Sequence, residues 1–189
     1  NSLKWRAGEW PGYLEVIMED GTVTKAEKFY YNYLTPFFIT KSSLLACDFT
    51  NELTDISVGD AWSPIYEKQG KGFSIVLSRS NRGNKILNEM VNDDIISLEP
   101  IDLTDALSMH GHMLDFKKRG SFIRIGMKKL IGQKVPLYGY KPNDITFSRK
   151  VIELIVTSIF LFSSNRLSRK ISELVPLKIL GPTFNFFRI

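Results

Sequence analysis

The chain of 189 residues is 43% apolar and 24% charged, which is typical of a globular protein and excludes a disordered one. Its length allows one substantial core, or a core with a smaller satellite. The single cysteine, Cys47, excludes a disulfide within the chain. We expect no secretory signal, because no basic segment followed by an apolar one stands at the start.

The net charge of +5 is divided unevenly along the chain, since residues 1–116 carry −7 and residues 117–189 carry +12. Such asymmetry suggests that the basic part faces an anionic partner: a phosphate-bearing cofactor, an acidic subunit or a lipid surface. The simpler alternative is that the two parts attract each other. Nucleic-acid binding is not expected, because no recognition motif accompanies the basic residues.

Strand patterns dominate the first hundred residues. Residues 13–19 and 22–30 predict a hairpin around an Asp-Gly pair. Residues 72–78 form the clearest strand, and we expect it at the centre of a sheet. After it, Asn84 can cap a helix whose apolar residues share one face. Residues 95–101 predict one more strand.

Helical patterns replace the strands from Thr104 onward. Residues 133–146, rich in Pro, Gly and Tyr, predict a linker between a unit of residues 1–132 and a basic, apolar helical extension of residues 147–189. The fold class is therefore α+β: a mostly antiparallel sheet, helices packed on one side, and a helical C-terminal extension. The helices are expected at residues 104–116, 121–131, 148–162 and 166–175.

The apolar run 151–162 is the one segment that invites a membrane hypothesis. It contains Glu153 and is only a dozen residues long, whereas a spanning helix needs about 20 apolar residues. Basic residues flank it on both sides, as in an interfacial helix on an anionic leaflet. A helix buried against the domain, or against another subunit, fits the pattern equally well.

Three segments combine glycine with aromatic or charged side chains. The opening Arg6–Gly12 presents Trp10, whose flat face suits an aromatic ring or a core contact. The block Asp55–Asp60 predicts a short strand that ends in a Gly59-Asp60 turn, where either carboxylate could contact a ligand or satisfy the local backbone. For Asp60 we favour the local role, because Gly-Asp turns commonly hydrogen-bond their own backbone.

The third segment, Gly72–Gly83, places two guanidiniums and two hydroxyls at the end of a strand. Arg79, Ser80 and Arg82 could together hold a diphosphate through bidentate and backbone contacts. Lys118, in a basic cluster after a predicted helix, is a further candidate for a phosphate or carboxylate contact; the helix dipole alone partly explains that cluster.

These segments resemble the beta subunits of coenzyme F-420 hydrogenase/dehydrogenase. Residues 52–60, Glu-Leu-Thr-Asp-Ile-Ser-Val-Gly-Asp, are similar to the family signature ELADISVGD, and the other two segments resemble further family motifs. In the family a Cys-x-x-Cys-x-Asp motif, associated with an iron–sulfur cluster, precedes this signature. Here the cysteines fall on Ser43 and Ala46, and Cys47 sits one place off, so a cluster is doubtful in this chain.

The resemblance implies a flavin-dependent oxidoreductase subunit in which FAD passes electrons between an iron–sulfur centre and a deazaflavin or another acceptor. It implies a missing N-terminal half or partner redox subunit, so this chain alone is expected to be inactive, in the cytoplasm or at a membrane surface. The alternative is a non-catalytic interaction module of surface-polysaccharide biosynthesis at the membrane face. No catalytic residue or metal ligand is predicted. The candidate cofactor-binding residues are Trp10, Asp55, Ser57, Gly59, Asp60, Arg79, Ser80, Arg82 and Lys118.

Overall fold

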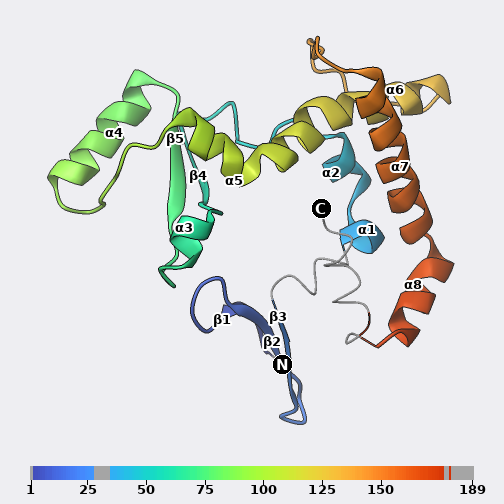
Figure 1. Ribbon diagram of the computed structural model, residues 1–189, viewed down its shortest axis with the longest axis horizontal. Coiled ribbons are helices and arrows are strands. Elements are labelled where there is room, and N and C mark those ends of the chain that lie inside the picture. Colours follow the sequence, from blue (N-terminus) through green and yellow to red (C-terminus); the bar gives the residue numbers. More distant parts are fainter. Residues whose placement is uncertain (1, 28–34, 177–178, 180–189) are drawn as a thin grey trace.

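The computed structural model describes residues 2–27, 35–176 and 179. Its small antiparallel sheets and its helices make an α+β fold that ends in a helical C-terminal part, which confirms the predicted class (Figure 1). The described strands form two separate sheets, one of three strands and one of two, instead of a single larger sheet.

The first sheet contains the predicted hairpin. The turn is held by the Thr22 N–H, which donates to the Asp20 carboxylate at 2.9 Å. The hairpin is therefore confirmed, while residues 28–30 of its second predicted strand lie outside the described residues. The opening segment adds a strand that the motif analysis did not predict. The sheet has the order β1 (Ser2–Ala7), β2 (Tyr13–Ile17) and β3 (Val23–Glu27), with both pairs antiparallel.

The second sheet pairs β4 (Ile56–Asp60) with β5 (Ser74–Ser78) in antiparallel register, Val58 opposite Val76. Two sequence predictions are wrong here. Within the described residues β5 pairs with β4 alone and is not a central strand. Gly59 and Asp60 belong to β4 itself, where Asp60 pairs with Ser74, and so do not form a tight turn.

The predicted strand at residues 95–101 is also wrong, because no strand forms there. Ser97 to Ile101 line a cavity together with residues of β5, so this segment runs beside the sheet. Pro100 lacks the N–H group that a ladder requires, which disfavours its pairing as an inner strand. The segment covers part of the sheet without extending it.

Helix α4 (Asn81–Asn92) begins four residues earlier than predicted. Its N-cap is Ser80, whose hydroxyl accepts from the Gly83 N–H at 3.0 Å, and not Asn84. Gly83 sits against the second sheet, where an added Cβ would lie 2.8 Å from both the Asp55 carbonyl oxygen and the Ser78 hydroxyl. Only glycine therefore lets the helix approach the sheet this closely.

The two helices predicted between residues 104 and 131 form one continuous helical rod. Helix α5 (Leu103–Asp115) passes through a π-helical turn (Phe116–Gly120) into α6 (Ser121–Leu130). Helix α5 begins one residue before the predicted start at Thr104, and its N-cap is Asp102. A π turn widens the backbone and often marks a functional part of a helix. Here it carries Lys117 and Lys118, which makes it a joint between the rod and the segment that precedes β4.

The last two helices follow the predicted linker. Residues 133–146 form neither helix nor strand, as predicted. Helix α7 (Phe147–Ser163) and helix α8 (Arg166–Leu174) confirm the predicted pair within one or two residues at each end, and they meet at an angle of 76°. The segment before Cys47 forms two short helices, α1 (Thr35–Phe38) and α2 (Lys41–Leu45).

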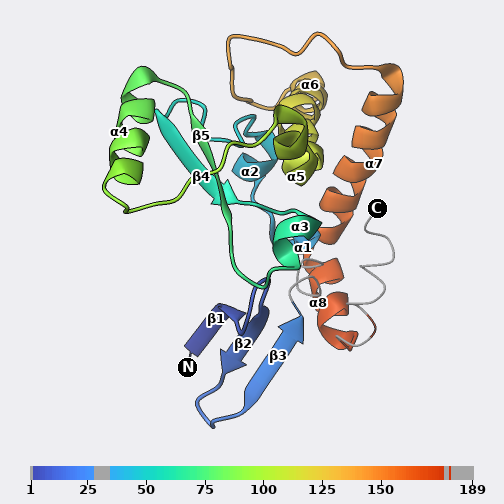
Figure 2. The ribbon, with the colours of Figure 1, turned by 60° about the vertical axis from the view of Figure 1, so that its left-hand side comes forward.

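The helical rod connects two sides of the molecule (Figure 1). The second sheet lies between α4 on one face and α5 on the other, while α7 and α8 run down the opposite side of the rod (Figure 2). The most deeply buried large side chains are polar: Arg124 of α6, Glu153 of α7 and Ser121. Glu153 accepts from Arg124 and, at 2.9 Å, from Arg149, so a buried ion cluster joins α6 to α7.

Candidate functional site

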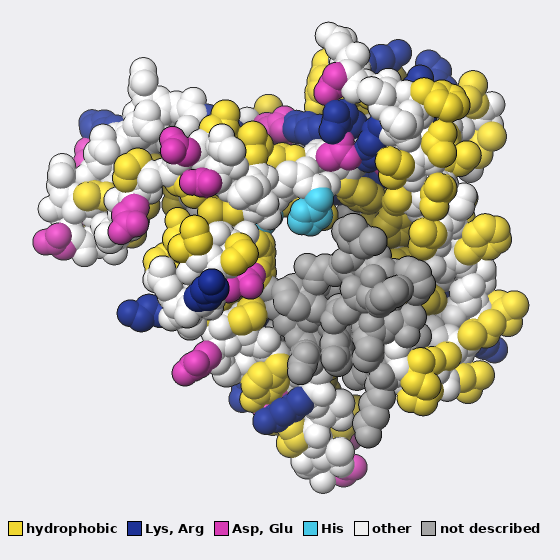
Figure 3. Space-filling view, in the orientation of Figure 1, with side chains coloured by type: hydrophobic (Ala, Val, Ile, Leu, Met, Phe, Trp, Pro, Cys, Tyr) yellow, Lys and Arg dark blue, Asp and Glu magenta, His cyan; other side chains and the backbone are white. Residues whose placement is uncertain are grey.

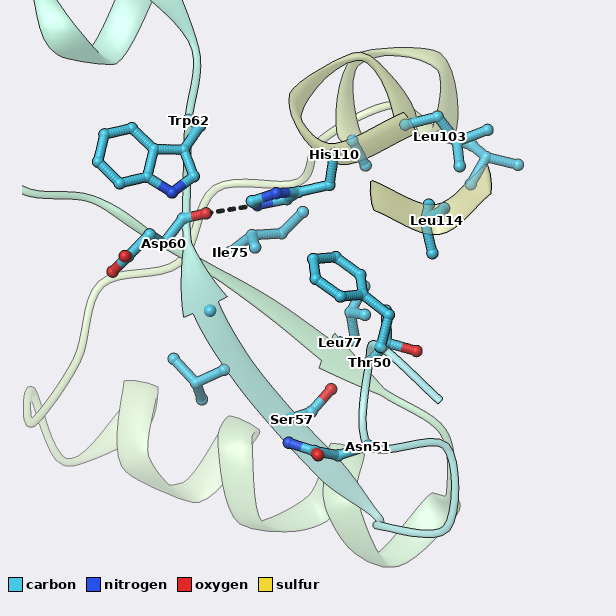
Figure 4. A pocket seen from close by; sticks show the side chains of 15 residues that line it. Thr50, Asn51, Ser57, Asp60, Trp62, Ile75, Leu77, Leu103, His110 and Leu114 are labelled. Carbon is cyan, nitrogen blue, oxygen red and sulfur yellow. Dashed lines mark hydrogen bonds between the residues drawn. The ribbon is translucent and has the colours of Figure 1, made fainter. Parts of the chain in front are cut away.

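A largely apolar pocket of about 530 Å³ lies between the β4–β5 sheet and helix α5 (Figure 4). We call it the β4–α5 pocket. Four signature residues line it, Ser57, Val58, Gly59 and Asp60, and β5 adds aliphatic side chains. Pockets of this size and character commonly bind small organic ligands. Its other lining residues include Phe49, Asn51, Trp62, Ile75, Leu77, Leu103, Ala106, Leu107, His110 and Leu114.

His110 is the polar residue that α5 contributes to this pocket. Its Nε2 atom lies 2.7 Å from the Asp60 carbonyl oxygen, and its ring meets the edge of Phe49 with centroids 5.6 Å apart. The contact joins α5 to the end of β4 (Figure 4). The sequence analysis missed His110, although a signal existed: it is the polar member of the stripe formed by Leu103, Leu107 and Leu114 on one face of α5.

Trp10 lies one layer behind the pocket. Its ring stacks on Trp62, with centroids 4.7 Å apart and planes at 26°, and Trp62 lines the cavity. The Arg6 guanidinium lies 4.6 Å from the Trp10 ring centroid and pairs with both carboxylate oxygens of Asp60. Asp60 thus anchors the first sheet to the second, a long-range role that replaces the local backbone role expected for its carboxylate.

Four further predicted residues form a network of internal hydrogen bonds. Ser80 donates to the Asp55 carboxylate while it caps α4. Arg79 donates to the Ser57 hydroxyl at 3.0 Å and to the Thr50 carbonyl at 2.7 Å. Because Ser57 and Thr50 both line the β4–α5 pocket, Arg79 holds two of its walls together.

Arg82 behaves differently from Arg79 and Ser80. It lies in the first turn of α4 and is exposed to solvent. The predicted diphosphate trio therefore separates into two residues that stabilise the protein and one cation that is open to a ligand.

Lys118 pairs with Glu52, the first residue of the signature, and its ammonium lies 6.0 Å from the Tyr140 ring centroid. Burial lowers the pKa of Lys118, but the hydrogen bonds and charges of Glu52 and Tyr140 together outweigh burial, and the net shift raises the pKa. The lysine therefore remains charged and connects the π turn to the signature segment.

The two residues that replace the family's cysteines, Ser43 and Ala46, accept hydrogen bonds from the helical rod. The Ser43 carbonyl accepts from Lys117 at 2.5 Å, and the Ala46 carbonyl accepts from Ser121 at 2.8 Å. Cys47 is buried, and the Tyr140 hydroxyl donates to its sulfur at 3.4 Å. Burial, followed by the nearby Arg124 charge, lowers the pKa of Lys117.

A bound iron–sulfur cluster does not fit this region. Such clusters are normally held by four thiolates, and the chain has one cysteine. Among residues 2–27, 35–176 and 179, no group of three or more His, Cys, Asp or Glu side chains could hold a metal ion.

A comparison with protein families identifies the chain. The family model for the C-terminal part of the coenzyme F420 hydrogenase/dehydrogenase beta subunit matches residues 2–104, more than half of the chain. The match includes both sheets and ends at the start of α5. No curated protein matches the chain, and no solved structure does. The chain belongs to the coenzyme F420 hydrogenase/dehydrogenase beta subunit family and contains that family's C-terminal domain.

Proposed function

We propose that this chain is part of a flavin-dependent electron-transfer subunit and that the β4–α5 pocket receives the ring of FAD. The observation that carries the proposal is the pocket itself: about 530 Å³, largely apolar, and walled by the family's own signature strand. FAD would supply the electron-carrying chemistry, and the protein would position the ring and exclude water from it.

The residues of the pocket fit a flat heteroaromatic ring. Gly59 leaves its part of the wall flat, since an added Cβ would meet only Ile75, at 3.8 Å. Trp62 and Phe49 offer aromatic surfaces, and Asn51 and Ser57 offer polar groups for ring heteroatoms. His110 fixes the distance between the helical and strand walls through its contact with the Asp60 carbonyl.

We assign the diphosphate contact to Arg82, because it is the exposed cation among the three residues that the motif predicted. Arg79 and Ser80 support the site indirectly: Arg79 joins Ser57 to Thr50, and Ser80 joins α4 to Asp55. The roles proposed for Trp10, Asp55 and Asp60 are likewise to hold the pocket walls in place.

A further protein part is expected to complete the site, either an N-terminal half or a partner redox subunit, since the matched family is that of a beta subunit. We propose a cytoplasmic location for the assembled enzyme. We also propose residues 133–146 as the boundary between the pocket-bearing unit and a helical extension, and the buried cluster between α6 and α7 would hold these two parts together.

The test is an anaerobic titration of the chain with FAD, followed by flavin fluorescence. Ala106 lines the pocket, so Ala106→Phe should fill it and abolish saturable binding. Ser108→Phe is the matched control, because Ser108 lies on the same helix and is exposed outside the pocket. Equal affinity for FAD in wild type and Ala106→Phe would refute the pocket assignment.

A second pair of variants tests the diphosphate contact. Arg82→Ala should weaken FAD binding about tenfold or more, since hydrogen bonds to charged groups contribute about 1.5–3 kcal/mol. Riboflavin, which lacks phosphate, should bind both proteins equally. Lys85→Ala, one turn further along α4, is the matched control. Loss of riboflavin binding in Arg82→Ala would contradict a contact with phosphate.

The competing function is a non-catalytic interaction module associated with surface-polysaccharide biosynthesis. It is favoured by the replacement of both cluster cysteines, which removes an electron carrier that the family motif would supply. If neither this chain nor a longer protein that contains it binds FAD, the flavin proposal is wrong and the interaction module is favoured.

A further inference from the structure

The outward face of α7 is apolar along its whole length. Val151, Leu154, Ile155, Ile159 and Phe162 are 42%, 55%, 57%, 50% and 73% exposed. Such a continuous row differs from the scattered apolar residues that ordinary protein surfaces carry. Hydrophobic side chains gather along this side of the molecule, over α7 and α8 (Figure 3).

The acidic residue in this run does not interrupt the face, because Glu153 points inward. Its side chain is fully buried and accepts hydrogen bonds from Arg124 and Arg149. Phe160 also faces inward, with its ring centroid 6.0 Å from that of Phe116. The buried ion cluster therefore removes charge from the exterior, and the outward face has no charged side chain between Lys150 and Arg166.

Helix α8 extends the apolar surface with Leu167, Ile171 and Leu174, which are 68%, 53% and 82% exposed. Their spacing places them on one side of the helix. We call the exposed apolar side chains of both helices the α7–α8 face. Within the described part of the chain, each helix taken alone is too short or too polar to span a membrane. Taken together, α7 and α8 have the length and composition of a span, but the pair is bent by 76°.

Cations border the α7–α8 face. Lys150 is exposed at the start of α7, and Arg166 and Lys170 are exposed on α8. Within the described part of the chain, none of the three takes part in an ion pair. A charged side chain at the centre of a bilayer is costly, so Arg166 and Lys170 favour helices that lie along a membrane surface over helices that cross it.

The face also lacks the polar groups that protein partners use. Protein interfaces carry about one hydrogen bond per 100–200 Å². Ser158 places a hydroxyl on the outward side of α7, but this hydroxyl already donates to the Leu154 carbonyl at 2.8 Å. A surface of aliphatic and phenyl groups bordered by lysine and arginine complements acyl chains beneath anionic headgroups.

We propose that the α7–α8 face binds the surface of an anionic phospholipid bilayer, with both helices in the plane of the headgroups. The apolar residues would enter the outer part of the acyl region, and Lys150, Arg166 and Lys170 would contact the headgroup phosphates. This inference rests on the exposed faces and charges of α7 and α8, independently of the flavin proposal.

The experiment is co-sedimentation of the whole chain with vesicles of phosphatidylglycerol and phosphatidylcholine, and with vesicles of phosphatidylcholine alone. Binding should be at least about tenfold weaker on neutral vesicles and should fall with added salt, because each surface cation contributes about 1 kcal/mol. Ile155→Glu should weaken binding about tenfold or more, since it removes an apolar side chain that would enter the bilayer and adds a negative charge. Ile65→Glu is the matched control: Ile65 is 69% exposed on α3 (Pro64–Glu67), and its replacement should change binding less than about twofold.

Four results would overturn the proposal. The first is absence of binding to anionic vesicles by the folded chain, and the second is equal binding by wild type and Ile155→Glu. The third is self-association of the wild type that Ile155→Glu abolishes without any vesicle binding, which would make the face an interface between copies. Bound protein should be released by carbonate at high pH, whereas retention would indicate a crossing segment and contradict an in-plane arrangement.

Discussion

Glu153→Gln is the substitution that most directly tests the structure of the helical half. It keeps the size and shape of the side chain and removes the charge that neutralises Arg124 and Arg149. Arg124 is 2% exposed, so water cannot replace the lost carboxylate there, whereas Arg149 retains Asp115 at 2.6 Å. Burial lowers the pKa of Arg124, and the Glu153 charge opposes that shift. The charged form of Arg124 is therefore stabilised by the ionised carboxylate of Glu153.

Removal of one partner from a buried ion pair costs about 3–5 kcal/mol of unfolding free energy. Since glutamine can still accept a hydrogen bond, we expect Glu153→Gln to lose about 3 kcal/mol. For a chain of this size, such a loss lowers the melting temperature by roughly 6–12 °C. Urea unfolding followed by far-UV and near-UV circular dichroism measures it, and the two signals also test whether the transition is two-state.

Two further variants separate the buried cluster from a general effect of charge. Glu173→Gln removes an exposed carboxylate on α8 and should change stability by less than about 0.5 kcal/mol. Arg124→Met combined with Glu153→Met should lose less than the sum of the two single methionine variants, because neither charge is then left alone. A loss below about 1 kcal/mol in Glu153→Gln would refute the reasoning.

Four other predictions follow from burial and local geometry. Gly83→Ala should destabilise the chain by about 1–3 kcal/mol in thermal unfolding, because its Cβ would clash with the Asp55 carbonyl. Gly111 has open space around it, so Gly111→Ala should stabilise the chain by roughly 0.5–1 kcal/mol in the same measurement. Because burial lowers the pKa of Lys117, the folded chain loses that proton first, so stability should rise with pH towards about 10.4. Lys117→Met should flatten this rise in urea titrations, and an unchanged slope would contradict it. Cys47 is 5% exposed, so thiol reagents should label it only slowly until urea unfolds the chain.

The parts of the fold that the sequence predicts are those determined by neighbouring residues. The hairpin depends on an Asp-Gly turn, and helices α7 and α8 depend on the spacing of apolar residues. The sequence predictions are wrong where contacts between residues far apart in the chain determine the structure. Ser80 and Asn84 are both good capping residues, and the bond from Ser80 to Asp55, which directly precedes β4, favours the earlier start of α4.

The candidate site shows the same division. The signature residues Ser57 and Gly59 were predicted from a local motif, and they line the pocket. His110 lies 50 residues after Asp60, and its contribution depends on how α5 crosses the second sheet. Periodicity predicts that His110 shares a face with apolar residues, but it does not predict which surface that face covers.

The buried ion cluster explains how one sequence supports both a helical joint and an apolar exterior. If Glu153 faced solvent, α7 would present a charge within its apolar face, and Arg124 would lack a countercharge beneath α7. Its inward orientation avoids both costs and requires Gly120, because a Cβ there would lie 2.7 Å from the Glu153 carboxylate. Gly120 ends the π turn that carries Lys117 and Lys118. The same turn of the rod therefore supports two sets of contacts. One set joins these two lysines to Ser43 and Glu52, and the other is the ion cluster beneath α7. A change at Gly120 should affect both together.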